Sequence, residues 1–280
     1  MKKIKIGFSD FWNGFNPEID NIFGLLLKKY FEVEYDNINP DFLFFSIHGD
    51  KHKSHNCTKI LFTPENFYSH KYGFFNYELG KNNFKKYSDY SITSFEIDDD
   101  TNFRMPCYIR RYGFDIVKEI ENRQTPTKTK KILFLHQNCV LFRDNFVKKL
   151  QKYIEVDCPG RCLNNKNIVV NDKIELLKDY KFVLSFENSS SPFYNTEKIL
   201  DGFISKSLPI YWGDPRVEDD FNPDSFLNYS KFDTEERLIE RIIYLNENEE
   251  EFLKTLSINP LKNYSIFNES YFINFLNKIF

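Results

Sequence analysis

Short apolar runs that stop abruptly at polar residues recur along this chain, and segments with helical spacing separate them. The clearest case is residues 181–215, where an apolar run at 183–186 ends at a polar segment. Apolar residues at helical spacing follow at 199–204, and a second apolar run lies at 208–212. Strand, loop, helix and strand in this order predict a βαβ unit, which belongs to a parallel sheet.

The same alternation covers the rest of the chain and indicates an α/β fold. It predicts further strands at residues 4–8, 32–36, 42–47, 59–62, 90–95, 132–135 and 155–157. It predicts helices at residues 19–30, 115–121, 142–154, 173–179, 234–256 and 271–280. Because strands and helices alternate, we expect parallel sheets throughout.

A polar segment without an apolar residue, 122–131, is the best domain boundary in the chain. We therefore expect an N-terminal α/β domain at residues 1–121 and a C-terminal α/β domain at residues 132–260, joined by a linker at 122–131. The remaining residues, 261–280, end in an apolar helix that we expect to pack back on the N-terminal domain.

Composition and charge exclude several classes of protein. A length of 280 residues suits two α/β domains, and Lys+Arg 38 against Asp+Glu 41 leaves a net charge of −3, without the basic excess of a nucleic-acid binder. The first apolar run is too short for a signal peptide or membrane anchor, so we expect a cytoplasmic protein with at most peripheral membrane association. The five cysteines are scattered and odd in number, which predicts neither a disulfide framework nor a zinc ribbon and suits a reducing compartment.

Lys198 is the residue that most needs a chemical explanation. Ligands of parallel sheets bind beyond the carboxyl ends of the strands, where helix N-termini point, and Lys198 lies in the first turn of such a helix. A cation there opposes the helix dipole by about 0.3–1 kcal/mol. Either an anion such as a phosphate shares the site, or Lys198 is a solvated side chain paired with Glu197.

Residues 186–215, FENSSSPFYNTEKILDGFISKSLPIYWGDP, resemble the hallmark of the α-1,3-fucosyltransferases, glycosyltransferase family 10. In that hallmark a phenylalanine-glutamate-asparagine triplet precedes a tyrosine and a threonine-glutamate-lysine triplet. Other elements of the family are similar to residues 62–66, 104–106, 156–162, 212–215 and 221–226 of this chain. The resemblance runs over most of the chain, and the bacterial members, which lack a Golgi membrane anchor, are the most similar in outline.

The resemblance implies a GT-B enzyme in which two Rossmann-like domains face each other across a cleft. The domain at residues 1–121 is then expected to bind the acceptor, and the domain at residues 132–260 to bind GDP-fucose. The implied reaction moves L-fucose, with inversion, from GDP-fucose to a hydroxyl of an acceptor glycan, expected to be O3 of GlcNAc in an α-1,3 linkage. It needs no cofactor, and its partners are GDP-fucose and an acceptor oligosaccharide, whose pocket the aromatic-rich segment 67–84 is expected to shape. Two alternatives are a catalytically silent protein that binds a nucleotide sugar or glycan, and a GT-B transferase that uses another GDP sugar.

Three residues match the catalytic groups of such a reaction. An acceptor hydroxyl that attacks an anomeric carbon needs a carboxylate base, and Glu65 matches it; its alternative role is that of a turn residue beside Asn66. The departing GDP gains negative charge, so the site needs cations that stabilise this charge. Lys198 and Arg143 match the cations that the family uses. A guanidinium suits a diphosphate because it donates two parallel hydrogen bonds, although Arg143 could instead pair with Asp144.

The resemblance also implies a set of donor-binding residues. They are Arg143, Glu187, Asn188, Tyr194, Asn195, Glu197 and Lys198. Glu187 has an alternative role, because a carboxylate at a strand end can simply stabilise the loop at Asn188.

Two patterns imitate metal sites. Residues 98–100 contain a D-x-D pattern, which in GT-A transferases binds a metal on the nucleotide diphosphate, but they lie far in sequence from the phosphate elements. The second pattern consists of His48, His52, His55 and Cys57, in a Lys-rich polar loop. We assign a metal ligand to neither.

Overall fold

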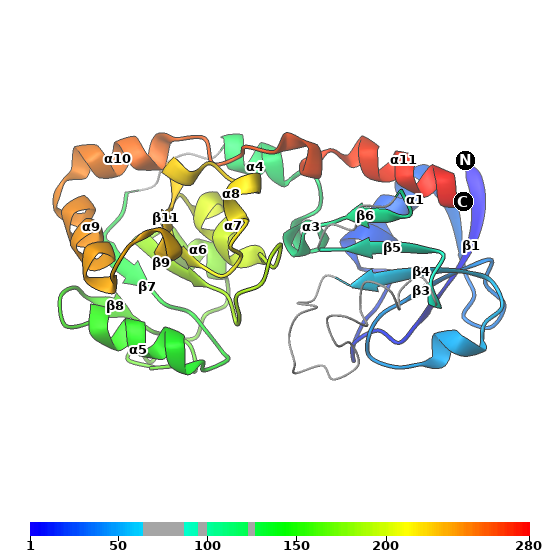
Figure 1. The fold of residues 1–280 in the computed structure, drawn as a ribbon, viewed down its shortest axis with the longest axis horizontal. Helices are drawn as coiled ribbons and strands as arrows, with labels where there is room; N and C mark the ends of the chain where they lie inside the picture. Colours follow the sequence, from blue (N-terminus) through cyan, green and yellow to red (C-terminus); the bar gives the residue numbers. More distant parts are fainter. Residues whose placement is uncertain (64–86, 95–99, 123–126) are drawn as a thin grey trace. The chain divides into compact units, whose positions relative to one another are not determined.

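A computed structural model describes residues 1–63, 87–94, 100–122 and 127–280 (Figure 1). The chain divides into two compact units, the first made of Met1–Ile116 with Ser265–Phe280 and the second of Val117–Tyr264. The division falls at the start of α4 (Ile116–Asn122), slightly before the polar segment that marks it in the sequence. Each unit contains one parallel sheet.

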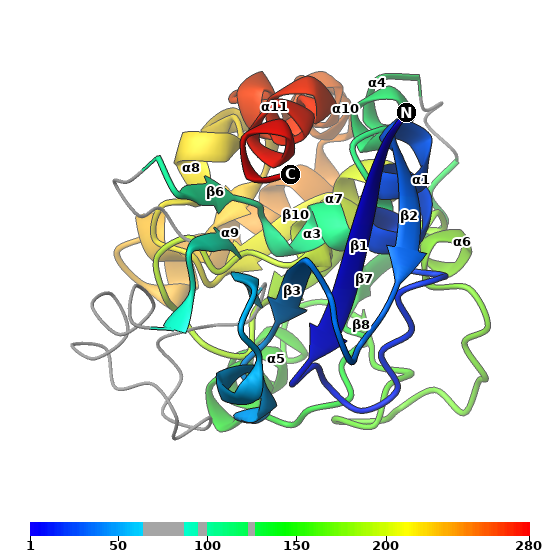
Figure 2. The ribbon, with the colours of Figure 1, turned by 90° about the vertical axis from the view of Figure 1, so that its right-hand side faces the viewer.

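The sheet of the first unit has six strands in the order β2-β1-β3-β4-β5-β6. These are β1 (Lys2–Ser9), β2 (Phe31–Tyr35), β3 (Phe42–Phe45), β4 (Thr58–Thr63), β5 (Tyr90–Thr93) and β6 (Asn102–Arg104). Figure 2 shows β1 and β2 side by side and pointing the same way, in the register Ile4 to Val33. β3 and β4 are central and apolar, as parallel strands covered on both faces must be.

The helices of the first unit are short except for the last. They are the π-helix η1 (Asn21–Leu26), α1 (Leu27–Tyr30), the 3₁₀-helix η2 (Lys51–Ser54), α3 (Cys107–Tyr112) and α11 (Glu269–Ile279). Asp20 caps η1 because its carboxylate accepts hydrogen bonds from the backbone N–H groups of Ile22 and Phe23. A side chain at Gly24 would meet the carbonyl oxygen of Glu18 at 2.1 Å, so this close approach requires glycine.

α11 completes the core of the first unit with residues from the far end of the sequence. Phe272 and Phe275 lie against Phe103 of β6 with ring centroids 5.0 and 5.5 Å apart. The terminal residue, Phe280, contacts Phe31 at 5.1 Å and Phe42 at 4.9 Å. Figure 1 shows α11 in red beside the strands of this unit.

The sheet of the second unit has five strands in the order β11-β10-β9-β7-β8. They are β7 (Lys130–Leu133), β8 (Val156–Asp157), β9 (Tyr180–Phe186), β10 (Leu208–Trp212) and β11 (Leu227–Asn228). Along β9, Phe182, Leu184 and Phe186 belong to one core cluster and Val183 to another. Both faces of β9 are therefore covered, which explains why its apolar run is continuous.

Helices cover both faces of this second sheet. They are α5 (Leu141–Leu150), α6 (Lys173–Leu177), α7 (Glu197–Ser205), α8 (Val217–Asp220), α9 (Glu235–Glu247) and α10 (Glu249–Ser257), with the 3₁₀-helices η3 (Pro223–Ser225) and η4 (Tyr229–Lys231). A further 3₁₀-helix, η5 (Tyr264–Phe267), begins at the last residue of this unit and continues into the first unit. Residues of α5, α9 and α10 share the larger core cluster, whereas Leu177 of α6 lies in the smaller one. The prediction of one helix over 234–256 is wrong, because Asn248 adopts φ −113° and ψ 88°, which separates α9 from α10.

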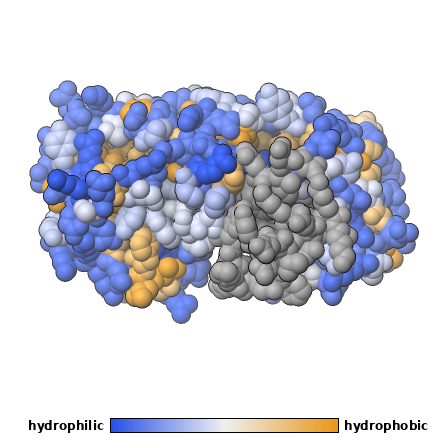
Figure 3. Space-filling model, viewed as in Figure 1, coloured by the Kyte–Doolittle hydropathy of each residue, from blue (hydrophilic) through white to orange (hydrophobic). Residues whose placement is uncertain are grey.

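The face seen in Figure 3 is mostly hydrophilic, with a hydrophobic patch near α5 of the second unit. Leu141, the first residue of α5, is 74% exposed. Within the ranges described above, no helix has the length and apolar character needed to cross a membrane.

Candidate donor site at the carboxyl edge of the second sheet

Seven of the eight predicted site residues lie in the second unit, and the eighth, Glu65, lies outside the described residues. Most of the seven follow the carboxyl end of β9, in the loop at 187–196 and in the first turn of α7. Arg143 comes from the first turn of α5. The parallel sheet brings these segments together because the carboxyl ends of its strands share one edge.

Glu187, Thr196 and Lys198 form one hydrogen-bonded network at the N-terminus of α7. The Glu187 carboxylate accepts from the Thr196 backbone N–H at 2.7 Å and from its hydroxyl at 2.8 and 2.9 Å. Lys198 Nζ donates to Glu187 Oε2 at 3.0 Å and to Thr196 Oγ1 at 2.7 Å. Glu187 is fully buried, so this network ties the end of β9 firmly to α7.

The network supplies an anion at the helix N-terminus from within the chain. The Glu187 carboxylate lies where the dipole of α7 favours negative charge, and it is nearer to Lys198 than Glu197 is, at 3.0 Å against 3.6 Å. Lys198 is thus stabilised in the first turn by Glu187 above all. Its side chain keeps 15% of its surface exposed.

The loop before α7 is held by Asp214, in the turn after β10. Asp214 accepts from the Phe193 backbone N–H at 2.7 Å and from the Asn195 amide at 3.0 Å. Phe193 has φ +64°, which non-glycine residues rarely adopt, so these bonds keep the loop in a costly conformation. At Gly213 a side chain would meet Glu187 Cγ at 2.4 Å, which explains the glycine there.

Arg143 is fully buried and donates to the loop after β9 and to the loop before α5. Its Nη1 donates to the Phe186 carbonyl at 3.1 Å, to the Asn188 side-chain oxygen at 3.1 Å and to the Glu187 carbonyl at 3.4 Å. Its Nη2 donates to the Asn138 carbonyl. Burial lowers the pKa of the guanidinium from its usual value, and the charge of Asp144 opposes this shift. Hydrogen bonds to the Phe186 and Asn138 carbonyls and to the Asn188 oxygen hold the Arg143 side chain in place.

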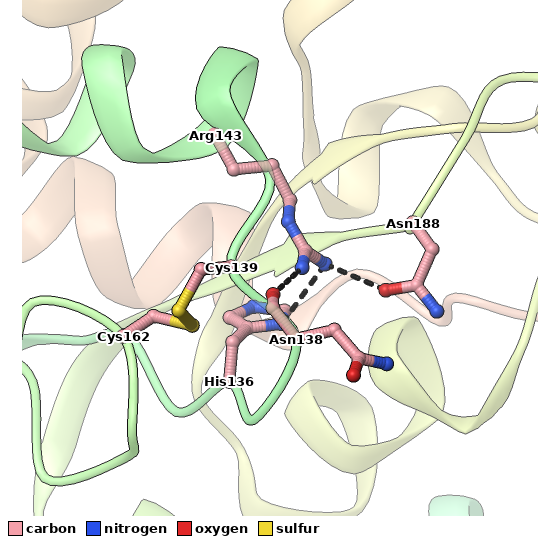
Figure 4. Close-up of a disulfide and its surroundings, with 6 residues drawn as sticks. All are labelled: His136, Asn138, Cys139, Arg143, Cys162 and Asn188. Carbon is pink, nitrogen blue, oxygen red and sulfur yellow. Dashed lines mark hydrogen bonds between the residues drawn. A yellow bond between two sulfur atoms is a disulfide. The ribbon is translucent and has the colours of Figure 1, made fainter.

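His136 is a site residue that the sequence interpretation missed. Its Nε2 donates to the Leu184 carbonyl at 3.2 Å, which leaves Nδ1 as an acceptor for Arg143 Nη1 at 3.1 Å (Figure 4). Burial, and then the charge of Arg143, lower the pKa of His136 well below 6.5, so the ring is neutral. The available signal was its place directly after the apolar run 132–135.

A disulfide joins Cys139 to Cys162, and this corrects the expectation drawn from the scattered cysteines. The two residues are 23 positions apart, and their Cα atoms are 5.3 Å apart. Each lies in a loop after a strand, one following β7 and the other following β8, and these neighbouring strands bring the loops together. Spacing along the chain gives no sign of such a pair, because the contact is made by the sheet.

The predicted donor-binding residues differ in how far they reach the surface. Asn188 is exposed, and the side chains of Lys198 and Glu197 are 15% and 23% exposed. Tyr194 is 7% exposed, and Arg143, Glu187 and Asn195 are fully buried. The open groups are therefore an amide, an ammonium and a carboxylate, with a buried guanidinium directly beneath Asn188.

The structure describes one of the two sequence patterns that imitate metal sites and only part of the other. Asp98 and Asp99 lie outside the described residues. In the other pattern, His52 Nδ1 lies 2.8 Å from Asp10 Oδ2, and its ring stacks on Phe45 at 4.2 Å. Among the residues that the structure covers, no group of three or more His, Cys, Asp or Glu side chains is placed to hold a metal ion.

Comparison with known proteins gives the chain a family. Residues 125–266 match glycosyltransferase family 10 (fucosyltransferase), C-terminal part, and residues 6–111 match the N-terminal domain of the α-(1,3)-fucosyltransferase FucT. Alpha-(1,3)-fucosyltransferase FucT of Helicobacter pylori is 40% identical over 119 residues, which cover 42% of this chain and 25% of that protein. GDP-fucose protein O-fucosyltransferase 3 of Xenopus laevis is 31% identical over 173 residues, covering 54% and 37%. The matched part is thus well under two thirds of the length of either relative.

Solved structures match the fold over the whole chain. A crystal structure of an α1,3-fucosyltransferase with GDP-fucose aligns with a TM-score of 0.79 at 23% identity, covering 100% of this chain and 91% of that one. An α-glucosyltransferase in complex with UDP and DNA aligns with a TM-score of 0.54 at 10% identity, covering 100% and 99%. These likenesses confirm the expected α/β fold of the GT-B kind, with two Rossmann-like domains. By its sequence and its fold, this chain belongs to glycosyltransferase family 10, the fucosyltransferases.

Proposed function

We propose that this chain transfers L-fucose from GDP-fucose to a hydroxyl of an acceptor glycan, with inversion, in an α-1,3 linkage to O3 of GlcNAc. The observation that carries the proposal is the cluster at the carboxyl edge of the second sheet, where the Arg143 guanidinium contacts the exposed Asn188 and Lys198 is paired with the neighbouring residue, Glu187. Membership of the fucosyltransferase family supports GDP-fucose as the donor. The H. pylori relative, named as an α-(1,3)-fucosyltransferase, supports the linkage.

The chemistry assigns one task to each group. The acceptor oxygen forms a bond to the anomeric carbon of fucose while the bond from that carbon to the GDP oxygen breaks. The hydroxyl proton passes to a carboxylate base, for which we propose Glu65, and the negative charge stays on GDP. Lys198 and Arg143 stabilise that departing charge, and we assign Asn188 and Glu197 to the donor hydroxyls. Two cations can take the place of a metal ion, so activity should survive EDTA.

Paired substitutions test the roles of base and cation. Glu65→Gln keeps size and hydrogen-bonding shape but cannot take a proton, so GDP binding should stay near wild type while transfer falls by about 10²–10⁴-fold. Lys198→Ala should weaken GDP binding as well as turnover, because its charge meets the phosphates in the ground state too. Calorimetry with GDP and radiolabelled fucose transfer measure the two effects. Near wild-type transfer by Glu65→Gln would show that another carboxylate is the base.

The alternatives differ in donor or in acceptor, so a panel of both separates them. A silent binding protein would bind GDP-fucose without turnover, and a transferase for another GDP sugar would prefer that sugar. One relative is named as a protein O-fucosyltransferase, so the panel needs folded proteins with Ser and Thr hydroxyls beside N-acetyllactosamine and chitobiose acceptors. Transfer to a protein hydroxyl alone would overturn the glycan acceptor and keep the donor.

A further inference from the structure

The guanidinium of Arg143 has more acceptors around Nη1 than it has hydrogens there. Nη1 carries two hydrogens. Four acceptor atoms lie within hydrogen-bonding distance, namely His136 Nδ1, Asn188 Oδ1, and the carbonyl oxygens of Phe186 and Glu187, at 3.1, 3.1, 3.1 and 3.4 Å. One acceptor can therefore leave without stranding a buried hydrogen, which makes the exchange of that acceptor inexpensive.

The four acceptors are not equally able to leave. The carbonyls of Phe186 and Glu187 belong to the backbone at the end of β9, where the Glu187 N–H donates to the Trp212 carbonyl at 2.8 Å. Asn188 is exposed, and its side-chain oxygen points towards the guanidinium (Figure 4). The exchangeable position around Arg143 is therefore that of the Asn188 amide oxygen.

His136 is the most firmly fixed side chain among them. It is 6% exposed, its ring lies 4.3 Å from that of Phe134, and its Nε2–H is held by the Leu184 carbonyl. Its carbonyl accepts from the Cys162 N–H at 3.2 Å, and any side chain at Gly160 would meet that carbonyl at 2.6 Å. The ring thus presents Nδ1 to Arg143 at a constant place.

We propose that His136 is a positioning residue, which fixes the guanidinium of Arg143 by accepting from Nη1, so that a phosphate oxygen of a nucleoside diphosphate can replace the Asn188 oxygen as an acceptor there. This inference rests on the proposed function, since it assumes that a diphosphate reaches this edge of the sheet. The geometry explains how a fully buried arginine can still bind a ligand, because only the exposed Asn188 side chain has to move away from the guanidinium.

Two substitutions of His136 separate its two hydrogen bonds. In His136→Asn the side-chain oxygen takes the place of Nδ1 and keeps the acceptor for Arg143, whereas in His136→Gln the amide nitrogen takes the place of Nε2 and keeps the donor to Leu184. We expect His136→Gln to weaken GDP binding by about tenfold and His136→Asn by no more than about twofold, as measured by calorimetry.

A double-mutant cycle shows whether the effect passes through the guanidinium. In an Arg143→Met background, which keeps much of the buried stem, His136→Gln should have no further effect on GDP affinity. A tenfold loss in that background, or no loss in the wild-type background, would overturn the inference while leaving the proposed function intact. Failure of the wild-type protein to bind GDP would overturn both. If His136→Gln does not fold, a tenfold loss in His136→Asn suffices to refute the role of Nδ1.

Discussion

The imidazole ring of His136 is uncharged, and positively charged side chains from three helices act on it. Arg143 of α5, Lys173 of α6 and Lys198 of α7 all lower its pKa, after the larger effect of burial, and the Leu184 carbonyl opposes them. A proton on Nδ1 would remove the acceptor for Arg143 and add a further positive charge. The native structure therefore favours the unprotonated ring.

The pH dependence of stability follows from this. As the pH falls below about 6.5, the unfolded chain takes up a proton that buried His136 does not, so the free energy of unfolding should fall with it. The chain has two tryptophans, Trp12 in the first unit and Trp212 in the second. Urea unfolding of a Trp12→Phe protein, followed by Trp212 fluorescence, measures the second unit alone. His136→Asn should flatten the dependence, and equal slopes in both proteins would contradict the explanation.

Single residues also show where sequence reasoning stops. The neighbours of Lys198 in the chain predict its place at a helix N-terminus, but they do not indicate its partner Glu187, which is eleven positions away. Asn195 stays a predicted donor-binding residue, but its neighbours in the chain give no sign that its amide donates to Asp214 or that it is fully buried. These hydrogen-bonding partners lie far away in the sequence and are brought close only by the fold, so a local sequence pattern does not reveal them.

Local patterns predicted the βαβ unit of β9, α7 and β10 well, because continuous apolar runs mark strands covered on both faces. They missed the break at Asn248, since the apolar spacing continues in phase from α9 into α10. They also missed β6, whose three residues are each only partly buried. The expected domain limits at residues 121 and 132 both lie after the division between the two compact units, which falls between Ile116 and Val117.

The disulfide should stabilise the loops that carry the site. Closing a loop between Cys139 and Cys162 removes chain entropy worth about 3 kcal/mol from the unfolded state. Reduction, or the double substitution of both cysteines by serine, should lower the unfolding free energy of the second unit by about that amount, read from Trp212. Burial raises the pKa of the third nearby cysteine, Cys158, to about 12, so it should not compete by exchange. Equal stability of the oxidised and reduced proteins would refute the prediction.

The two units should respond differently to loss of the C-terminal segment. A chain that ends at residue 264 lacks α11, including the buried Phe272, Phe275 and Leu276. Each such side chain contributes about 2–5 kcal/mol, so their joint loss exceeds the stability of a typical domain. We expect the first unit to lose its cooperative transition, as read from Trp12 in a Trp212→Phe protein, while the second unit keeps its urea midpoint in a Trp12→Phe protein. A preserved Trp12 transition would show that α11 is dispensable.

The place of α11 in the chain also matters while the protein is being made. The residues of the second unit are contiguous, so they can fold as soon as they leave the ribosome, whereas the first unit waits for a helix that is translated after the whole of the second unit. Its six strands pair only in parallel across the described ranges, so no local hairpin holds them in the meantime. During synthesis β5 and β6, whose Tyr90 and Phe103 contact α11 in the folded protein, must therefore remain without this cover, which makes chaperone binding to this half of the nascent chain an expected part of its production.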